Sequence, residues 1–371
     1  MQFFWTGILS LGTLKLPASL PSLLGVYYDD DYISMSKTDF QTEKQIVRDY
    51  YAALEAASAD DIKAVMRGYV AEGYHWRGFH PFDELYGADA VAETFWQPLK
   101  TSLTSMQRRM DIFMAGDNAL DYGGVWVISM GHLMGLFDTA WLGIQPTGKI
   151  AMLRYAEFNR IAEGKIVETA MYFDIPHLMI QAGLTPFPPQ TGAHMIQPGP
   201  MTHDGLLFDA QPSEEAAKTD AAIDYMVSDI KDWKGGREEP LVDELRRSWN
   251  EDMVWWGPAG IGATFTIPRY AEQHAGPFRA AFDNRIFNGH VARVTEGHYG
   301  GFFGWPNLTL THKGGFMGMP GSDKPADMRV IDIYRRSGDK LTENWIFIDL
   351  LHFWKMHGLD VLGRMAAVPR T

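Results

Sequence analysis

Apolar and polar positions change period along the chain, and the same sequence of changes occurs twice. In the first half, apolar residues recur at helical spacing over residues 46–70 and again from Gly87 to residue 103. Alternating or continuously apolar runs, typical of β-strands, cover residues 74–79, 110–116, 124–137, 150–161 and 165–174. Two helices, a strand, a helix and then a run of antiparallel strands predict an α+β domain.

The same order of elements returns in the second half. Helical spacing covers residues 221–233, 241–250 and 268–282, with a short strand at 252–257. Strands are then predicted at 285–303, 305–316, 328–338 and 340–349, followed by a closing helix at 350–365. We therefore expect a second copy of the same domain.

A segment of seventeen residues shows this repeat without a gap. ETAMYFDIPHLMIQAGL begins at Glu168 and aligns with ENWIFIDLLHFWKMHGL, which begins at Glu343, at an offset of 343 − 168 = 175. In each copy an apolar strand ends in an aspartate, and Asp-x-x-His opens the next helix. A repeat at this distance predicts tandem domains.

The predicted boundaries follow from the repeat and from local composition. They are a leader at residues 1–40, a first domain at 41–184, a linker at 185–212 and a second domain at 213–371. The leader is apolar but interrupted by prolines, so it is too short to span a bilayer, and a degenerate signal peptide stays open as an alternative. The linker holds six prolines and is long for a loop inside a compact domain.

Composition excludes several functional classes. The 371 residues include 33 Lys and Arg and 46 Asp and Glu, a net charge of −13, with no concentrated basic run. We therefore expect neither nucleic acid nor a membrane as a partner. Because the chain has no cysteine, disulfides, zinc–thiolate sites and cysteine nucleophiles are excluded, and a cytoplasmic location is expected. The sequence contains no phosphate-binding glycine loop and no nucleophile elbow.

Asp174 and Asp349 are the first candidates for chemistry. Each ends an apolar strand, where an aspartate is costly to bury without a partner. A structural interpretation is that each caps the following helix. A catalytic interpretation is that each carboxylate lies in an apolar pocket, where burial raises its pKa and suits it to proton transfer near neutral pH. The two roles can coexist.

Two pairs of histidines accompany these aspartates. His132 and His312 are predicted on matching strands, either as half-buried structural residues or facing the same cavity and polarising a carbonyl. His177 and His352 lie one helical turn after the aspartates, a spacing that can place two metal ligands on one face. No spacing supplies further ligands, so we expect packing or substrate contact and no metal.

Aromatic residues gather around these positions. Most belong in the core, but a surplus of Trp and Tyr also suits a pocket for a flat apolar ligand. The predicted substrate contacts are His75, Trp76, Tyr86, Trp126, His177, Trp256, Trp345 and His352.

Several of these segments resemble the SnoaL-like polyketide cyclases, a family of the nuclear transport factor 2-like superfamily. The resemblance covers about residues 42–184, through HWRGFHPFDELYGADAVAETFWQPL and IAEGKIVETAMYFDIPHLMIQAGL. It also covers about residues 214–365, through THKGGFMGMP and DKLTENWIFIDLLHFWKMHGL. It implies two cone-shaped α+β barrels, each a curved antiparallel sheet wrapped around helices, with a deep pocket.

The resemblance also implies a function and its residues. In that family the strand-end aspartate acts as acid and base and a pocket histidine assists, without a cofactor; carried over, these are Asp174 and Asp349, assisted by His132 and His312. We therefore expect a cyclase, isomerase or lyase acting on a small, apolar or aromatic carbonyl compound, with dehydratase and hydrolase reactions open. The alternative is a non-catalytic ligand-binding or scaffold protein of the same fold. The two domains are expected to pack as a pseudo-dimer, and further homo-oligomerisation stays open.

Overall fold

The first half of the protein contains one sheet and the helices that cover it. The computed structural model describes residues 39–365, so the predicted leader lies almost wholly outside the described residues. The elements are α1 (Gln41–Ala56), α2 (Ile62–Tyr69), β1 (Val70–Gly78), β2 (Asp83–Tyr86), α3 (Ala88–Val91), η1 (Ala92–Trp96), α4 (Gln97–Ser102), β3 (Leu103–Asp117), β4 (Val125–Phe137), β5 (Ile150–Ala162), β6 (Lys165–Phe173) and α5 (Ile175–Gln181).

The second half repeats this order. Its elements are α6 (Ser213–Ile230), α7 (Leu241–Ser248), β7 (Trp249–Trp256), β8 (Thr264–Phe265), α8 (Ile267–Tyr270), η2 (Ala271–Ala275), α9 (Gly276–Ala281), β9 (Phe282–Phe287), β10 (Ala292–Glu296), β11 (Tyr299–His312), η3 (Phe316–Gly318), β12 (Pro325–Ser337), β13 (Lys340–Ile348) and α10 (Leu350–Met356). The predicted strands at 285–303 and 305–316 are wrong, because turns at Gly289 and Gly297, both at positive φ, divide this stretch differently. The closing helix ends at Met356, before Gly358 at positive φ.

Both sheets have the same strand order. The first is β2-β1-β6-β5-β4-β3, and the second is β10-β11-β12-β13-β7-β8, with β9 also paired to β11. Neighbouring strands are antiparallel except β1 with β6 and β7 with β13. The predicted α+β fold, a curved sheet wrapped around helices in each half, is confirmed, and each sheet is open rather than closed into a barrel.

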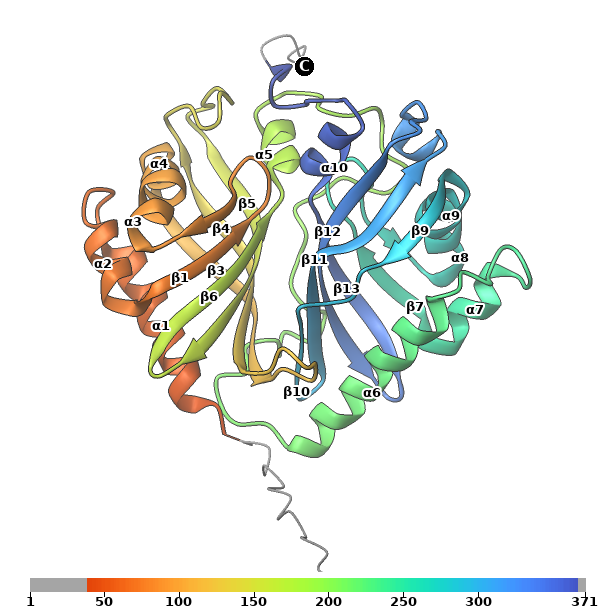
Figure 1. Cartoon of the computed structure of the whole chain (residues 1–371), viewed down its shortest axis with the longest axis horizontal. Helices are drawn as coiled ribbons and strands as arrows, with labels where there is room; N and C mark the ends of the chain where they lie inside the picture. The colour runs from red at the N-terminus through yellow and green to blue at the C-terminus, as the bar shows by residue number, and fades with distance from the viewer. Residues whose placement is uncertain (1–38, 366–371) are drawn as a thin grey trace, which may run out of the picture. The chain divides into compact units, whose positions relative to one another are not determined.

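The two sheets lie next to each other in the centre of the described unit, and each half's helices cover the far side of its own sheet (Figure 1). Trp126 and Phe158 contact Phe303 with ring centroids 5.4 and 5.3 Å apart. Arg154 donates to the carbonyl oxygen of Ile346 at 3.0 Å. We call the sheet faces that meet here the junction faces, and the opposite faces, covered by helices, the inner faces.

Equivalent residues of the two halves can be matched through a shared irregularity. A register shift in β3 places Ser105 at positive φ, and a register shift in β9 places Asn284 at positive φ. The offset is 284 − 105 = 179 here, so Phe287 takes the place of Arg108. On β5 and β12 the offset is 175, as it is for Asp174 and Asp349.

Residues 185–212, the predicted linker, contact both halves. Phe113 of β3 donates its backbone N–H to Gly205 at 2.8 Å, and Ala193 pairs with Ala263 of the second half. The Lys44 ammonium donates to the carbonyl oxygen of Leu207 at 2.6 Å. The predicted domain boundaries themselves stay a prediction. Within residues 39–365, no helix has the length and hydropathy needed to cross a membrane.

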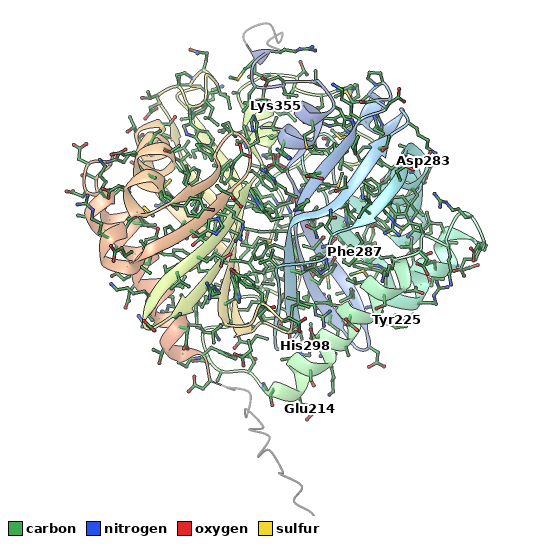
Figure 2. The ribbon with its side chains drawn as sticks, in the orientation of Figure 1. Glu214, Tyr225, Asp283, Phe287, His298 and Lys355 are labelled. Atoms are coloured by element: carbon green, nitrogen blue, oxygen red, sulfur yellow. The ribbon has the colours of Figure 1, made fainter. Side chains whose placement is uncertain are left out.

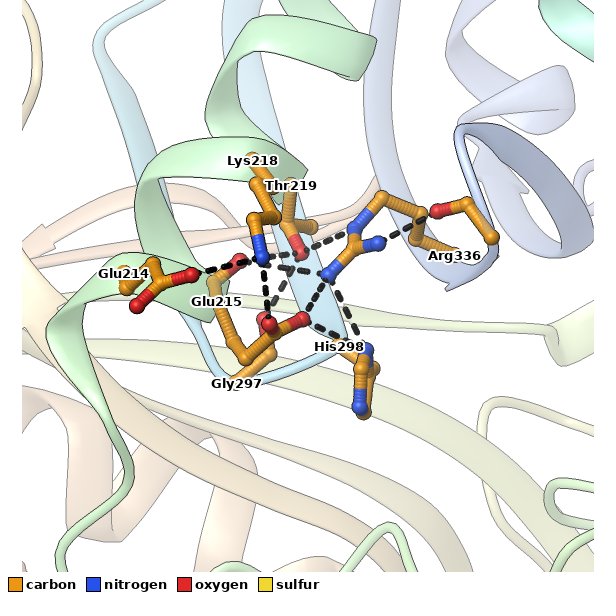
Figure 3. A network of polar contacts seen from close by, with 8 residues as sticks. Glu214, Glu215, Lys218, Thr219, Gly297, His298 and Arg336 are labelled. Carbon is orange, nitrogen blue, oxygen red and sulfur yellow. Dashed lines mark hydrogen bonds and ion pairs between the residues drawn. The ribbon is translucent and has the colours of Figure 1, made fainter.

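A polar network fixes the start of α6 on the second sheet (Figure 3). Arg336 of β12 donates to the Thr219 hydroxyl at 3.0 Å, and this hydroxyl donates to the carbonyl of Gly297 at 2.7 Å. Arg336 also pairs with the Glu215 carboxylate, which lies 3.4 Å from the His298 ring. Because α6 is held at this end, its apolar side is positioned over the inner face of the sheet.

Candidate functional site

The second half encloses a cavity of about 180 Å³ between its helices and the inner face of its sheet. The aromatic part of its wall consists of Trp233, Trp249, Trp255, Tyr270, Phe278, Phe287, Phe302 and Tyr334. Phe287, on β9, is labelled among the side chains in Figure 2. Since an engineered apolar cavity of about 150 Å³ binds benzene, this space suits a compact aromatic ligand.

Asp332 is the acidic residue of this cavity wall. It lies in the middle of β12, opposite Ile346, which also lines the cavity. Asn344 donates its amide to Asp332 Oδ1 at 3.0 Å, and the Tyr334 hydroxyl donates a second hydrogen bond. No Lys or Arg of the described chain forms an ion pair with it.

This environment changes the proton affinity of Asp332. Burial raises the pKa of its carboxyl to about 7, although the hydrogen bonds from Asn344 and Tyr334 act in the opposite direction. A carboxyl with a pKa near the ambient pH can both accept and donate a proton during a reaction. The second half therefore has, on the wall of an aromatic cavity, a carboxyl whose pKa lies near neutral pH.

His274, in η2, lies on the helical side of the same cavity. Its ring stacks on Trp255 with centroids 3.9 Å apart, and its Nδ1 atom is buried without a hydrogen-bond partner. Burial, together with the charge of Arg279, lowers the pKa of His274 to about 3. At neutral pH this imidazole is uncharged and can offer an N–H or a lone pair to a bound ligand.

An ion pair occupies the corresponding position in the first half. Glu157 takes the place of Asp332, and Arg108 donates to Glu157 Oε2 at 2.7 Å. The Arg108 guanidinium also lies 3.7 Å from the ring centroid of Tyr51 and 4.5 Å from that of Tyr155. In the second half Phe287 lies at the position of Arg108, and no cation within residues 39–365 forms an ion pair with the inner carboxylate of Asp332.

Asp174, a predicted catalytic residue, is the N-cap of α5. Its Oδ1 accepts the backbone N–H of His177 at 3.0 Å. Its Oδ2 accepts the backbone N–H of Ala259, in the second half, at 2.9 Å. The capping interpretation therefore describes the observed contacts, and the same carboxylate joins the two halves.

Asp349 repeats this arrangement from the other side. Its Oδ1 accepts the N–H of His352 at 3.2 Å, and its Oδ2 accepts the N–H of His80, in the first half, at 2.9 Å. Burial raises the pKa of Asp349 to about 6, while Arg329 acts in the opposite direction. Neither aspartate lines the described cavity, since both lie on the junction side, so the predicted position in the cavity is corrected. Their catalytic role stays a prediction.

His132 and His312 are not equivalent residues. His132 lies opposite Arg154, whose side chain binds the second half, so His132 lies on the junction face. His312 pairs with Phe282, whereas Phe137 pairs with the equivalent Leu103, so His312 corresponds to Phe137. The predicted equivalence is wrong because His132 and His312 are 312 − 132 = 180 residues apart, whereas strand pairing aligns this part of β4 and β11 at an offset of 175.

The other contacts of these histidines are local. The Nδ1 of His132 lies 3.6 Å from the Asp111 carboxylate, and the Nδ1 of His312 lies 3.1 Å from the carbonyl oxygen of Pro320. Burial lowers the pKa of His312. Neither histidine lines the cavity of the second half.

The residues predicted to contact substrate also lie away from this cavity. Those buried in packing are Trp76, Trp126 and Trp345, and His177 is held between Gln181 and the carbonyl of Met195. Tyr86 is 63% exposed and stacks on His75. The carbonyl of Trp256 accepts from Arg154, while its neighbour Trp255 faces the cavity, because successive strand residues point to opposite faces.

His352 belongs to a cluster at the junction of the halves. The ligand atoms of His80, Asp83 and His352 lie within 4.8 Å of one another, a spacing that suits a metal ion. However, Arg329 lies 2.6 Å from the Asp83 carboxylate, and Lys355, labelled in Figure 2, lies 3.4 Å from the His80 ring. Arg329 therefore already neutralises the Asp83 carboxylate and Lys355 lies at the Nε2 atom of His80, so the cluster is a polar contact between the halves.

Sequence reasoning missed Asp332, although a signal was present. Both RYAEFNR and RVIDIYRR place one acidic residue in the middle of an apolar strand, at 332 − 157 = 175. A charged residue at the centre of such a strand needs a partner or a function.

Residues 307–355 match the family model described as SnoaL-like polyketide cyclase. The resemblance to this family is confirmed. The matched segment contains β12 and β13, and therefore Asp332, Tyr334 and Asn344 of the cavity wall.

The two solved structures described next each match about two fifths of this chain. A protein from Jannaschia sp. CCS1, assigned as a SnoaL-like polyketide cyclase, is 17% identical with a TM-score of 0.32, covering 39% of this chain and 94% of that chain. An NTF2-like protein from Burkholderia thailandensis E264 is 26% identical with a TM-score of 0.28, covering 38% of this chain and 95% of that chain. Comparison with curated proteins gives no match.

Proposed function

We propose that the second half is an acid–base enzyme site for a small, largely apolar carbonyl compound, with Asp332 as the proton-transferring group. The observation that carries this proposal is the position of Asp332: it is buried on an aromatic cavity wall, without a cation partner, and burial raises its pKa to about 7. The SnoaL-like match over residues 307–355 favours a cyclase- or isomerase-type reaction.

The proposed first step is the removal of a proton from the carbon next to the carbonyl. The Asp332 carboxylate accepts this proton, while Asn344 and Tyr334 hold the carboxylate in place. The electron pair of the C–H bond moves to form an enolate, and the uncharged His274 donates an N–H to the enolate oxygen. General acid–base catalysis of this kind contributes about 10²–10⁴-fold to a rate.

The second step decides the reaction type. Return of the proton to a different carbon gives an isomer, attack of the enolate carbon on a second carbonyl gives a ring, and loss of a leaving group gives a lyase product. In each case Asp332 gives up the proton that it took, so it is regenerated. A ligand that fills the space between the aromatic walls would displace water, which would strengthen its polar contacts. A cytoplasmic location and cofactor-free chemistry remain part of this proposal.

Deuterium exchange tests the proposal without knowledge of the natural substrate. The protein is incubated in heavy water with acetophenone, 1-indanone or 2-tetralone, and deuterium uptake at the α-carbon is followed by mass spectrometry. We expect Asp332→Asn to lower the catalysed exchange by about 10²-fold or more. The first-half variant Glu157→Gln serves as the matched control and should exchange at the wild-type rate once circular dichroism shows that it is folded, because it leaves Arg108 without its ion-pair partner.

A second control addresses the strand-end aspartates. The double variant with Asn at positions 174 and 349 should retain exchange as long as circular dichroism shows that it is folded. Loss of exchange in that folded variant, or wild-type exchange in Asp332→Asn, would contradict the assignment of Asp332.

The alternative is a non-catalytic ligand-binding or scaffold protein. The first half favours it, because its inner carboxylate, Glu157, is held in an ion pair with Arg108. This alternative predicts that ligands enter the second-half cavity while no ketone gains deuterium above the rate without protein.

A further inference from the structure

Basic side chains gather around the second-half cavity. Lys231, Arg279 and Arg285 line it, whereas Asp332 is the acidic residue of its wall. The chain as a whole has 33 Lys and Arg against 46 Asp and Glu, so the balance of charge around this cavity is the reverse of the average. Such a reversal at a ligand cavity points to a negatively charged ligand group.

Arg279 and Arg285 differ in how their charges are compensated. Arg279 pairs with the Glu244 carboxylate and donates to the carbonyl of Gly235 at 3.0 Å. Arg285 has no carboxylate at ion-pair distance anywhere in residues 39–365, and its guanidinium lies 4.5 Å from the ring centroid of Trp233. Arg285 is half-buried, so it has lost part of its hydration without gaining a direct ion pair within residues 39–365.

The Arg285 guanidinium contacts Trp233 in a way that leaves its N–H groups available for hydrogen bonds to a ligand. A guanidinium that lies over an aromatic ring uses its flat face for that contact, and its N–H groups can still hold a carboxylate with two parallel hydrogen bonds. Burial lowers the pKa of Arg285, and the charges of Arg279 and Arg237 lower it further, while the Asp232 carboxylate, which lies beyond ion-pair distance, acts in the opposite direction. A bound anion would relieve the cost of burying this charge.

The first half lacks this feature. At the offset of 179, Met106 takes the place of Arg285, and the inner cation there is Arg108, which is already neutralised by Glu157. An unpaired inner arginine is therefore specific to the half that contains the cavity.

We infer that the cavity takes a flat, largely apolar molecule with one carboxylate, which Arg285 binds while the aromatic walls hold the rest. Lys231, exposed at the same cavity, adds positive charge. A cavity of about 180 Å³ leaves room for about one aromatic ring with a short side chain. This inference names the ligand class of the proposed substrate site. It rests on the proposed function in one respect, namely that this cavity binds the substrate.

Isothermal titration calorimetry with two probes of the same shape tests the inference. trans-Cinnamate carries a carboxylate, and cinnamamide replaces it with an uncharged amide. We expect the wild-type protein to bind cinnamate about tenfold more tightly or better. In Arg285→Met this preference should fall to within about twofold, with the affinity for cinnamamide unchanged, and Arg285→Lys should lie between the two.

Arg269→Met is the matched control, because Arg269 is an exposed arginine of α8 that pairs with Glu272 and does not line the cavity. It should keep the wild-type preference. Equal affinities for the two probes, failure of both to bind, or a preference that survives in folded Arg285→Met would each overturn the inference.

The variant Asp332→Asn separates this inference from the proposed function. In this variant the preference for cinnamate over cinnamamide should still depend on Arg285. The reason is that the ligand carboxylate is proposed to contact Arg285, whereas the reacting carbon is proposed to contact Asp332. If deuterium exchange is unaffected in Asp332→Asn while Arg285 still selects cinnamate, the acid–base proposal fails and the inference about the ligand stands.

Discussion

Replacing Asp332 with Asn should stabilise the protein at alkaline pH, although it removes the proposed catalytic group. Burial raises the pKa of Asp332 from 3.8 to about 7 in the folded protein. The folded state therefore keeps a proton that the unfolded state has already lost between these two pH values. The contribution of Asp332 to stability is fully present below about pH 4 and is lost as the pH rises through about 7.

The size of this loss follows from the pKa shift. The difference 7 − 3.8 is about 3 units, and each unit corresponds to about 1.4 kcal/mol, so the wild-type protein loses about 4 kcal/mol between pH 4 and pH 8. Asn has the same shape and does not ionise. The unfolding free energy of Asp332→Asn minus that of the wild type should therefore increase by about 4 kcal/mol from pH 4 to pH 8.

Urea unfolding at pH 4, 5, 6, 7 and 8, followed by tryptophan fluorescence, measures this difference. Taking the difference between variant and wild type cancels the titration of all other groups. Asp283→Asn is the control, because Asp283 is an exposed residue of β9 (Figure 2) that pairs with Lys313. A difference for Asp332→Asn that stays flat with pH would refute the raised pKa and remove the basis of the proposed function.

Three further predictions concern buried contacts, each measured by urea unfolding at pH 7. Arg108→Met leaves Glu157 buried without its cation and should cost about 3–5 kcal/mol, much of which a further Glu157→Gln change should restore. Lys44→Met should cost a similar amount, because Glu296, 2.6 Å away across the halves, loses its partner; Glu296→Gln in the same chain should reduce the loss. Asp174→Ala removes an N-cap and a bond between the halves and should cost about 1–2 kcal/mol with unchanged deuterium exchange.

The fold could be predicted from the sequence because helical and strand spacing are local patterns and both occur in the same order in each half. The change from helical to strand spacing is visible in each copy, and the gapless segment from Glu168 fixes the offset of 175. The aspartate before a helix was also readable, and capping is the role in which Asp174 and Asp349 are observed.

The face on which each strand residue lies was not readable. Both faces of each sheet are buried here, one by its helices and one by the other half, so the alternation of polar and apolar positions disappears. On β4 the described positions are almost all buried, so nothing in the sequence separates His132 on the junction face from Ser129 on the inner face. The prediction therefore assigned junction residues to the cavity.

Register shifts also prevent the sequence from showing on which face of a sheet a side chain lies. One extra residue in a strand sends all later side chains to the opposite face, and β3 and β9 each contain such a shift, whereas β11 has two extra residues against β12. His312 was matched to His132 by residue type, but strand pairing places it with Phe137. Only the three-dimensional pairing shows which residues share a face.

The two inner carboxylates carry the argument for function. In the first half, Arg108 neutralises Glu157 and fills the space around it, which is the arrangement that stabilises a core. In the second half the same position keeps Asp332 without a cation, at a cost of about 4 kcal/mol above neutral pH. The first half shows that this fold can neutralise its inner carboxylate, so packing does not require Asp332 to stay uncompensated on the wall of the cavity that Arg285 also lines. Local departures from stable packing of this kind are expected where a site binds and transforms a ligand.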